Sequence, residues 1–374
     1  MKRILAILCS FILLCSFAGC KGVMGGEDGA SVSLTDSFSE GDSKGSSGAA
    51  VISESTDSGS GGSSLAERRR YVEQYRERII VYGWLIAAVK DDGTLLYTEE
   101  HLKGEGFLGQ EDRIDALRDV AGLKPAFGFS GVKKDGSVFA LWNNSSKKNI
   151  FPHFETWTDI TDWNLQISSV LAVKEDGTVI MDGELREMSL ANWPEDWIEY
   201  DLTGWQDVTA VTCAYLGSDM FGLKRDGTVC YVSTSKRSVE EKAFENVLKW
   251  KDIVQLSSSR RNIAGLRSDG GVEVTGFGID TYNSYLNNAA YWKDIVSIAV
   301  GNNGIAGLKA DGTVVYAGDD TKGQEACLEW EDIIAIAMGD EYVVGLREDG
   351  TVVSTSAGNL TAGWNIFENR ELLM

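Results

Sequence analysis

Histidine, proline and basic residues are scarce in this sequence. Of 374 residues, two are histidine and three are proline, and 56 acidic residues stand against 35 lysines and arginines. With only His101 and His153 available, a histidine-based mechanism or a histidine metal cluster has few candidates. The net charge of −21 argues against a nucleic-acid partner, because phosphate recognition needs clustered basic residues. Scarce proline beside 42 glycines favours many tight turns over a disordered linker protein.

Cysteine is too sparse for a disulfide framework. Beyond the first twenty residues only Cys213, Cys230 and Cys327 remain, and an odd number in an exported domain leaves one unpaired. Cys213 and Cys230 are predicted on the first and third strands of one sheet. Two strand spacings of ~4.8 Å exceed the ~7 Å Cα limit for a bridge. We expect all three to be small buried apolar residues.

The N-terminus has an apolar run too short for a membrane span, but it fits a secretory signal. Lys2 and Arg3 precede the apolar residues 4–14. Residues 16–20, Ser-Phe-Ala-Gly-Cys, resemble a bacterial lipoprotein signal, in which the cysteine is lipidated, although Phe17 replaces the usual leucine. An ordinary signal peptide cut after Gly19, or an uncleaved anchor, is the alternative. We predict a signal peptide over 1–19, a lipid anchor on Cys20 and an extracytoplasmic position at the cell membrane.

Residues 20–64 have no hydrophobic periodicity and consist mainly of serine, glycine and acidic residues. Such a segment cannot bury enough apolar surface to offset its ordering entropy, so we predict a flexible tether. Residues 65–78 have Tyr71, Tyr75 and Ile79 at helical spacing and are predicted as a short helical lead-in. Its Arg68-Arg69-Arg70 run is interpreted as a solvated helix face, with contact to an anionic membrane as the alternative.

One phrase recurs seven times in the rest of the chain, residues 79–374. Each copy has an apolar residue followed by lysine or arginine, then one further residue, Asp-Gly and a second apolar run. The glycines of successive copies lie 38 to 50 residues apart, which is the repeat length of propeller blades. Asp-Gly between alternating apolar runs is a strong hairpin signal, and we interpret its aspartate as a turn former. The copies are Val89–Leu95, Val132–Val138, Val173–Val179, Leu223–Val229, Leu266–Val272, Leu308–Val314 and Leu346–Val352.

A second marker, Trp-x-Asp-Ile or Trp-x-Asp-Val, precedes five of the copies. It is predicted to open the first strand of a blade, with its tryptophan packed between blades. Small residues such as Gly307 are predicted to let neighbouring blades approach. The fold class is therefore all-β, a seven-bladed β-propeller with four up-and-down strands per blade, the outermost short or a loop. The five markers are Trp157–Ile160, Trp205–Val208, Trp250–Ile253, Trp292–Ile295 and Trp330–Ile333.

The first copy lacks this marker, and the last copy is followed by an isolated one. Ile79-Ile80-Val81 stands where the first strand is expected, with no Trp-x-Asp-Ile before it. The end of the chain carries Trp364-Asn365-Ile366. We predict that this segment supplies what the first blade lacks and so closes the ring.

The repeats resemble those of the regulator-of-chromosome-condensation family, whose members form seven-bladed propellers. The resemblance rests on the hairpin phrase in all seven copies, on Tyr316–Gln324 and on Val138–Asn144, and it covers residues 79–366. The family often has a histidine in the second strand, and no repeat has one here. The family includes a nuclear nucleotide-exchange factor, a secreted β-lactamase inhibitor and exported bacterial proteins. Since this chain is acidic and carries an export signal, the resemblance implies an exported binding protein.

The sequence contains no nucleophile motif, phosphate-binding loop or metal-spaced cluster, so we predict no enzyme, cofactor or metal. The predicted binding face carries the loops between first and second strands, because they vary while the Asp-Gly turns do not. Plain solvation is the alternative for each of these residues. Two insertions, Glu184–Gly204 and Asp280–Tyr291, are rich in aromatics that either bind a ligand or cover a blade edge. The candidate binding residues are Tyr215, Asp219, Arg260, Arg261, Asn302, Asn303, Glu341, Tyr342, Trp193, Trp197 and Tyr200.

Together these features predict a monomeric propeller that is held at the membrane by its lipid anchor and binds a protein partner. The alternative is a protein that binds, or less readily degrades, cell-surface carbohydrate through its aromatic loops. Exposed aromatic side chains serve either purpose, because they anchor protein partners and stack on sugars. The sequence leaves the ligand open.

Overall fold

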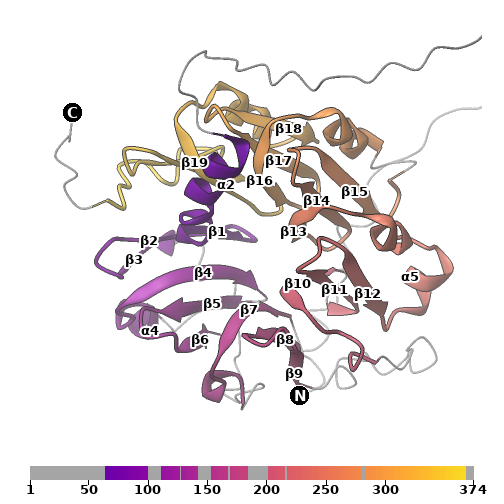
Figure 1. Cartoon of the computed structure of the whole chain (residues 1–374). Coiled ribbons are helices and arrows are strands. Elements are labelled where there is room, and N and C mark those ends of the chain that lie inside the picture. The colour runs from indigo at the N-terminus through magenta and orange to yellow at the C-terminus, as the bar shows by residue number, and fades with distance from the viewer. Residues whose placement is uncertain are drawn as a thin grey trace, which may run out of the picture. The chain divides into compact units, whose positions relative to one another are not determined.

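The structure is a computed structural model of the whole chain (Figure 1), and it describes residues 64–99, 111–126, 128–141, 153–166, 169–183, 201–214, 217–279 and 284–367. The chain separates into two compact units, Met1–Ser60 and Gly61–Met374, and every described residue belongs to the second. The predicted signal peptide, Cys20 and nearly all of the tether lie outside the described residues. No helix in the described part is long and apolar enough to cross a membrane.

Seven antiparallel sheets of three strands each make up the described blades, and they confirm the predicted seven-bladed β-propeller. The strands of each sheet lie side by side in chain order. The first strands are β1 (Ile79–Tyr82), β4 (Val120–Ala126), β7 (Ile160–Leu165), β10 (Val208–Ala214), β13 (Ile253–Ser258), β16 (Ile295–Val300) and β19 (Ile333–Met338). The second strands are β2 (Leu85–Val89), β5 (Gly128–Lys133), β8 (Ser169–Lys174), β11 (Asp219–Lys224), β14 (Asn262–Arg267), β17 (Gly304–Lys309) and β20 (Val343–Arg347). The third strands are β3 (Leu95–Tyr97), β6 (Val138–Leu141), β9 (Val179–Gly183), β12 (Val229–Ser233), β15 (Val272–Gly276), β18 (Val314–Gly318) and β21 (Val352–Ser354).

The first strands form the inner wall of the ring. Each contacts the first strand of the next blade, in the order β1, β4, β7, β10, β13, β16, β19 and back to β1 (Figure 1). The core is divided among the interfaces between blades. Leu308 and Val314 of the sixth blade, for example, pack in one cluster with Ile333 and Val343 of the seventh. Closure of the ring packs each first strand against those of the two neighbouring blades.

Of the two predicted forms of the outer segment, a short strand or a loop, the described residues show no fourth strand in any blade. The outer position of four blades is taken by short 3₁₀ helices, which contact the third strands β6, β12, β15 and β18. These helices end just before the next marker tryptophan, so they lead the chain into the following blade. They are η2 (Phe154–Thr156), η4 (Glu245–Lys249), η5 (Ser284–Tyr291) and η6 (Gln324–Glu329), and two short α-helices, α4 (Glu111–Asp115) and α5 (Lys236–Glu240), also lie between blades.

The Asp-Gly turns have the same geometry in all seven blades. The aspartate Oδ1 accepts a hydrogen bond of 2.8–3.0 Å from the backbone N–H two residues later. The following glycine has a φ between 79° and 86°, a conformation that glycine adopts without strain. The repeated aspartate is therefore a turn former, as predicted. In the first blade the Thr94 hydroxyl and N–H both donate to Asp92 and lower the pKa of that carboxyl to about 2.

These turns should make the ring sensitive to acid. The same hydrogen bonds lower the pKa of Asp176 and Asp226. Their contribution to stability is therefore complete above about pH 5 and is lost as the pH falls through the folded pKa. Asparagine keeps the acceptor but does not titrate. We expect the triple variant Asp92→Asn, Asp176→Asn, Asp226→Asn to lose less unfolding free energy between pH 4 and pH 2 than the wild type. Urea unfolding at each pH measures this, and parallel curves would contradict it.

The marker residues connect consecutive blades through their backbone. The marker aspartates Asp119, Asp159, Asp207, Asp252, Asp294 and Asp332 all have a left-handed φ between 57° and 61°. The backbone carbonyl oxygen of each marker aspartate accepts a hydrogen bond of 2.7–2.9 Å from a backbone N–H in the Asp-Gly turn of its own blade. In five of the six cases, the N–H of the next residue donates to the carbonyl oxygen of the turn glycine in the preceding blade. The second blade has this geometry at Asp119 without a tryptophan. There Leu117 stands at the tryptophan position, which is why the sequence pattern missed this marker.

The marker tryptophans pack between blades, as predicted, and the second-strand glycines make room for them. Trp250 lies in one cluster with Phe244 of the preceding blade and Ile263 of its own. A Cβ added at Gly265 would lie 2.9 Å from the Trp250 ring, and Gly222, Gly307 and Gly345 meet Trp205, Trp292 and Trp330 in the same way. Gly307 thus accommodates the tryptophan of its own blade, and the predicted approach of two blades is not its reason.

This packing predicts that Gly265→Ala destabilises the fold. The added methyl would collide with the Trp250 ring, and overpacking of this kind costs about 1–3 kcal/mol of unfolding free energy. Gly204→Ala is the matched control, because a Cβ there would meet nothing within 4 Å. Urea unfolding of both variants should show a lower midpoint for Gly265→Ala alone. Equal midpoints would show that the ring and glycine are not in firm contact.

A lead-in helix lies on the Asp-Gly face of the ring. Helix α2 (Leu65–Glu73) begins with a capping box between Ser64 and Glu67 and is followed by η1 (Arg76–Arg78). It contacts β16 and β19 (Figure 1). Arg68 forms an ion pair of 3.0 Å with Glu348, and Arg69 donates to the carbonyl oxygens of Arg267 and Ser268. These arginines hold the helix on the ring, so the expected solvated or membrane-bound face is wrong for them.

The helix covers only part of this face. The second residue of the first strand is buried in the sixth and seventh blades, where Val296 packs with Val72 and Ile334 packs with Tyr75. The same position is exposed in the third and fourth blades, where it is Thr161 and Thr209. The helix thus buries an apolar residue at this position in two blades, whereas the equivalent threonines of the third and fourth blades stay exposed.

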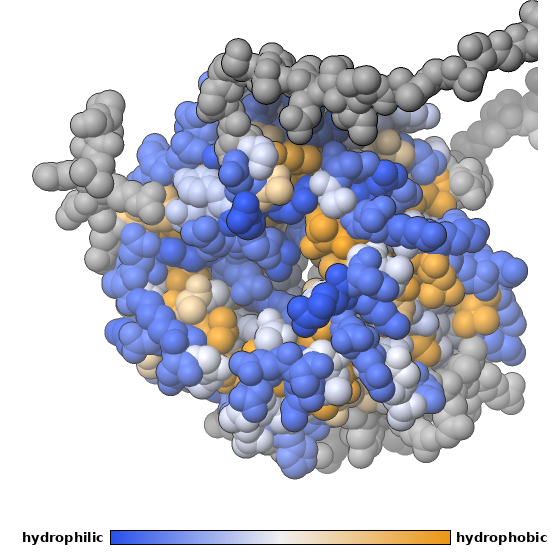
Figure 2. All heavy atoms as spheres, in the orientation of Figure 1, coloured by the Kyte–Doolittle hydropathy of each residue, from blue (hydrophilic) through white to orange (hydrophobic). Residues whose placement is uncertain are grey.

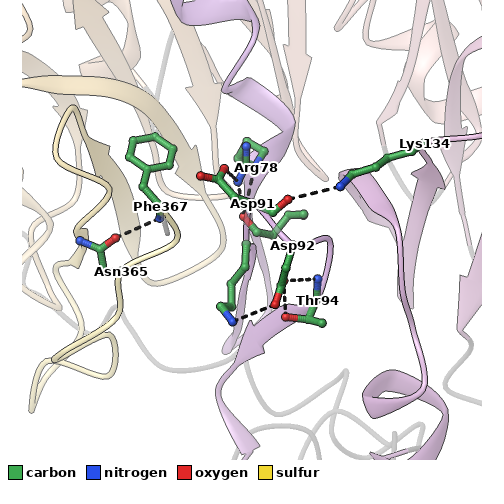
Figure 3. Close-up of polar contacts among 9 residues, drawn as sticks. Arg78, Asp91, Asp92, Thr94, Lys134, Asn365 and Phe367 are labelled. Atoms are coloured by element: carbon green, nitrogen blue, oxygen red, sulfur yellow. Dashed lines mark hydrogen bonds and ion pairs between the residues drawn. The ribbon is translucent and has the colours of Figure 1, made fainter. Parts of the chain in front are cut away.

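The C-terminal segment closes the ring as predicted. Ile366 N–H donates to the Gly350 carbonyl oxygen of the last blade, and its own carbonyl oxygen accepts from Asp91 N–H of the first, both at 3.0 Å. Other markers bridge two blades in a similar way, but there the aspartate carbonyl accepts and the next residue donates, whereas here Ile366 makes both bonds. On the first blade, the Arg78 guanidinium donates to the Val89 carbonyl oxygen and forms an ion pair with Asp91 (Figure 3). The same guanidinium lies 5.9 Å from the Phe367 ring centroid. The first blade has its own first strand, β1, so the segment adds a marker and not a strand.

Candidate functional site

A cavity of about 740 Å³ occupies the centre of the ring. Its walls come from the first strands of all seven blades, and the end of the lead-in segment reaches it at Glu73, Arg76 and Glu77. Figure 2 shows the ring hollowed at this point. The volume is in the range of small-molecule sites.

Side chains of the wall bond across neighbouring blades. Gln255 donates to the Ile298 carbonyl oxygen and accepts from the Ile298 N–H, at 3.0 and 3.1 Å. Ser257 accepts from the Val300 N–H at 3.0 Å. These bonds satisfy the inward-facing backbone of the first strands and fix the width of the channel.

A charged cluster joins the lead-in segment to this wall. Lys124 of β4 pairs with Glu77 of η1 at 3.2 Å and with Asp162 of β7, and its Nζ lies 4.8 Å from the Trp163 ring centroid. Asp162 also accepts from the Val211 N–H at 2.6 Å. Burial lowers the pKa of Lys124, while the nearby Glu77 opposes that shift. The groups satisfy one another, so this cluster serves to bind the segment to the ring.

The loops between first and second strands form the rim at the other end of the channel. In the fifth, sixth and seventh blades they are joined by side chains. Asn302 Oδ1 accepts from the Arg260 N–H at 3.1 Å, and Asn302 Nδ2 donates to Asp340 at 2.5 Å. Desolvation raises the pKa of Asp340, and the nearby Arg260 charge opposes the shift. The structure thus brings two predicted residues, Arg260 and Asn302, together with Asp340 in one arc that lines the cavity.

The arc continues to a tryptophan that the sequence analysis missed. Trp84 lies in the Tyr82-Gly83-Trp84 turn of the first blade, lines the cavity and is 48% exposed. Gly83 lies next to the seventh-blade loop, because a Cβ on Gly339 would come within 3.2 Å of the Gly83 carbonyl oxygen. The signal was present in the sequence as an aromatic residue at a first–second loop. It was overlooked because the first blade lacks the marker that locates this loop in the others.

No protein-family model matches the sequence, and no curated protein sequence matches it. Among solved structures, the CRINKLY WD40 ectodomain of the Arabidopsis thaliana receptor kinase ACR4 is 12% identical, with a TM-score of 0.49 over 74% of this chain and 93% of that one. Prp20p from Saccharomyces cerevisiae is 13% identical, with a TM-score of 0.46 over 66% of this chain and 73% of that one. Yeast RCC1 (Prp20) bound to Kap60 is 11% identical, with a TM-score of 0.45 over 81% of this chain and 85% of that one.

These solved structures include an RCC1 propeller, which is the family that the repeats resemble. At such identities and TM-scores the likenesses add nothing on function. The fold itself rests on the seven sheets of the chain and on the contacts that close them into a ring.

The other predicted binding residues differ in their exposure and contacts. Arg261 is exposed on the rim, Asn303 and Tyr342 are half-buried, and Glu341 forms an ion pair of 3.7 Å with Lys322. Four predicted residues lie outside the described residues, namely Tyr215, Trp193, Trp197 and Tyr200.

Asp219 is not on the binding surface. It is the first residue of β11 and is fully buried, and Tyr231 and Ser238 each donate to its carboxylate at 2.8 Å. Burial raises the pKa of Asp219 even though these hydroxyl groups favour its charged form. Its role is to join the second and third strands of the fourth blade to α5.

The cysteines agree with the sequence analysis except that Cys230 is only partly buried. Cys213, Cys230 and Cys327 are free thiols, and the first and third of them are buried. Burial raises the pKa of Cys230 to about 11 and that of Cys327 to about 12, so both are protonated near neutral pH.

Within the described residues no group of acidic, histidine or cysteine side chains is placed to hold a metal ion.

Proposed function

We propose that this chain is a membrane-tethered extracytoplasmic interaction module, anchored through Cys20, that binds a protein partner on the rim of first–second loops. The anchor, the tether and the export signal are inferred from residues 1–64. The binding face is inferred from the described rim.

One observation carries this proposal. The rim loops of three consecutive blades are joined into a continuous surface by the bonds from Arg260 to Asn302 and from Asn302 to Asp340. These loops differ in sequence, whereas the opposite face repeats the same turn and is partly covered by α2. A varied surface held rigidly by a regular scaffold is how repeat proteins bind a specific partner.

Charge reversal on the rim tests the proposal. The full chain is used to capture envelope proteins, and the variant Arg261→Glu, Glu341→Lys should capture the partner roughly tenfold less well, because rim charges steer association. The matched control is Lys251→Glu, Glu331→Lys, which reverses two exposed charges at the markers on the opposite face. Loss of capture in the control alone, or in neither variant, would refute the rim as the binding face.

A further inference from the structure

We propose that the channel mouth binds a neutral sugar ring, with Trp84 as the stacking surface and Asp340 and Arg260 as the groups that bond its hydroxyls. The inference rests on the proposed function only in placing ligand binding on this face. It adds a small-ligand site inside the rim, with its own residues.

The mouth is preformed by tight loop packing. A Cβ on Gly301 would overlap the Gly339 carbonyl oxygen, and a Cβ on Gly339 would overlap Val81. The loops of the sixth, seventh and first blades therefore cannot shift independently. A ligand entering here spends little free energy on ordering the site, which favours the binding of small molecules.

The polar groups suit hydroxyls. One oxygen of Asp340 accepts from Asn302. The residue as a whole is exposed, although its carboxylate is partly desolvated. The Arg260 guanidinium is also exposed and donates no hydrogen bond to any other described residue. A carboxylate and a guanidinium together accept from and donate to vicinal hydroxyl groups, each of which is both donor and acceptor.

The charges at the mouth favour a neutral ligand. The Arg260 N–H and the Asp340 carboxylate both bond to Asn302, so these two oppositely charged residues lie close together and their charges offset each other locally. An anion would meet Asp340, and a cation would meet Arg260. A sugar ring meets neither repulsion.

The exposed indole completes the site. A pyranose ring has an apolar face of C–H groups, and an aromatic ring with an accessible face packs against it while polar groups bond the ring's edge. Trp84 lines the same cavity as Arg260, Asn302 and Asp340 and lies on the blade next to Asp340. A flat apolar surface beside polar groups at the mouth of a 740 Å³ cavity is the arrangement that a sugar requires.

Calorimetric titration of the full chain tests this inference. The probes are neutral oligosaccharides of glucose, galactose, mannose and N-acetylglucosamine, with glucuronic acid and a lysine-rich peptide as charged comparisons. We expect at least one neutral sugar to bind. Trp84→Ala should weaken that sugar's binding roughly tenfold, and Trp84→Phe should restore most of it. The matched control is Tyr291→Ala. This side chain is 82% exposed on η5, which packs on the third strands β15 and β18 and does not line the cavity, so its loss should leave binding unchanged.

Two further measurements distinguish the possible ligands. Free monosaccharide and isolated envelope glycan are compared, so that a soluble sugar is distinguished from a polymer of the cell surface. Binding of only the charged probes, or sugar binding that survives Trp84→Ala, would overturn the inference. If no sugar binds while capture of a protein still depends on Arg261 and Glu341, this inference fails and the proposed function stands.

Discussion

Replacing Lys124 by methionine should lower the unfolding free energy of the ring by about 3–5 kcal/mol. The side chain is nearly buried and neutralises both Glu77, 3.2 Å away on the lead-in segment, and Asp162 on the third blade. Removing one partner of a buried ion pair leaves the other charge without compensation, which is far costlier than losing a surface pair. Urea unfolding of Lys124→Met at pH 7 measures the loss.

Two further variants serve as a control and a rescue for this result. Lys242→Met removes an exposed lysine 3.8 Å from Glu245 and should change stability by less than about 0.5 kcal/mol. Adding Glu77→Gln and Asp162→Asn to Lys124→Met removes the uncompensated charges and should recover much of the loss, since the new amide oxygen can still accept from the Val211 N–H. If Lys124→Met unfolds at the wild-type urea midpoint, then this charged cluster does not stabilise the packing of the lead-in segment on the ring.

The repeats and the ring could be predicted from the sequence because their signals are local. An Asp-Gly turn and a Trp-x-Asp marker each lie within a few residues, and their geometry depends on glycine and aspartate conformations that recur in every blade. Where one residue of a marker changed, as at Leu117, the pattern was lost although the fold was kept. The outer segment of each blade was left open as a short strand or a loop, because no residue pattern in it favours either form.

The site was less predictable because it depends on contacts between distant blades. Arg260 and Asn302 could be chosen from the loops in which they lie, but their bond to one another and to Asp340 follows from the stacking of three blades. Asp219 was misplaced for the same reason. The residues that bury it, Tyr231 and Ser238, follow it in sequence and reach it only through strand pairing and α5.

The ring closure should be the other point of high sensitivity. Ile366 is fully buried and Phe367 is 7% exposed, and Phe367 packs against Tyr75 at a centroid distance of 5.9 Å. Phe367→Ala should lower the unfolding free energy by about 3–5 kcal/mol, and Ile366→Ala by about 2–5 kcal/mol. Leu248→Ala is the control, since that side chain is 58% exposed on η4 and its loss should cost less than about 0.5 kcal/mol.

A chain ending at Gly363 should lose more than either single variant. It lacks the bonds from Val352 to Trp364, from Ile366 to Gly350 and from Asp91 to Ile366, as well as the buried side chains. The junction between β19 and β1 would then rest on side-chain packing and on the ion pair between Arg68 and Glu348. Amide exchange should therefore quicken first in β1, β2, β20 and β21, before the blades opposite them, because the ring opens where its marker is missing. Uniform exchange across all seven blades, or an unchanged urea midpoint, would show that the segment does not close the ring.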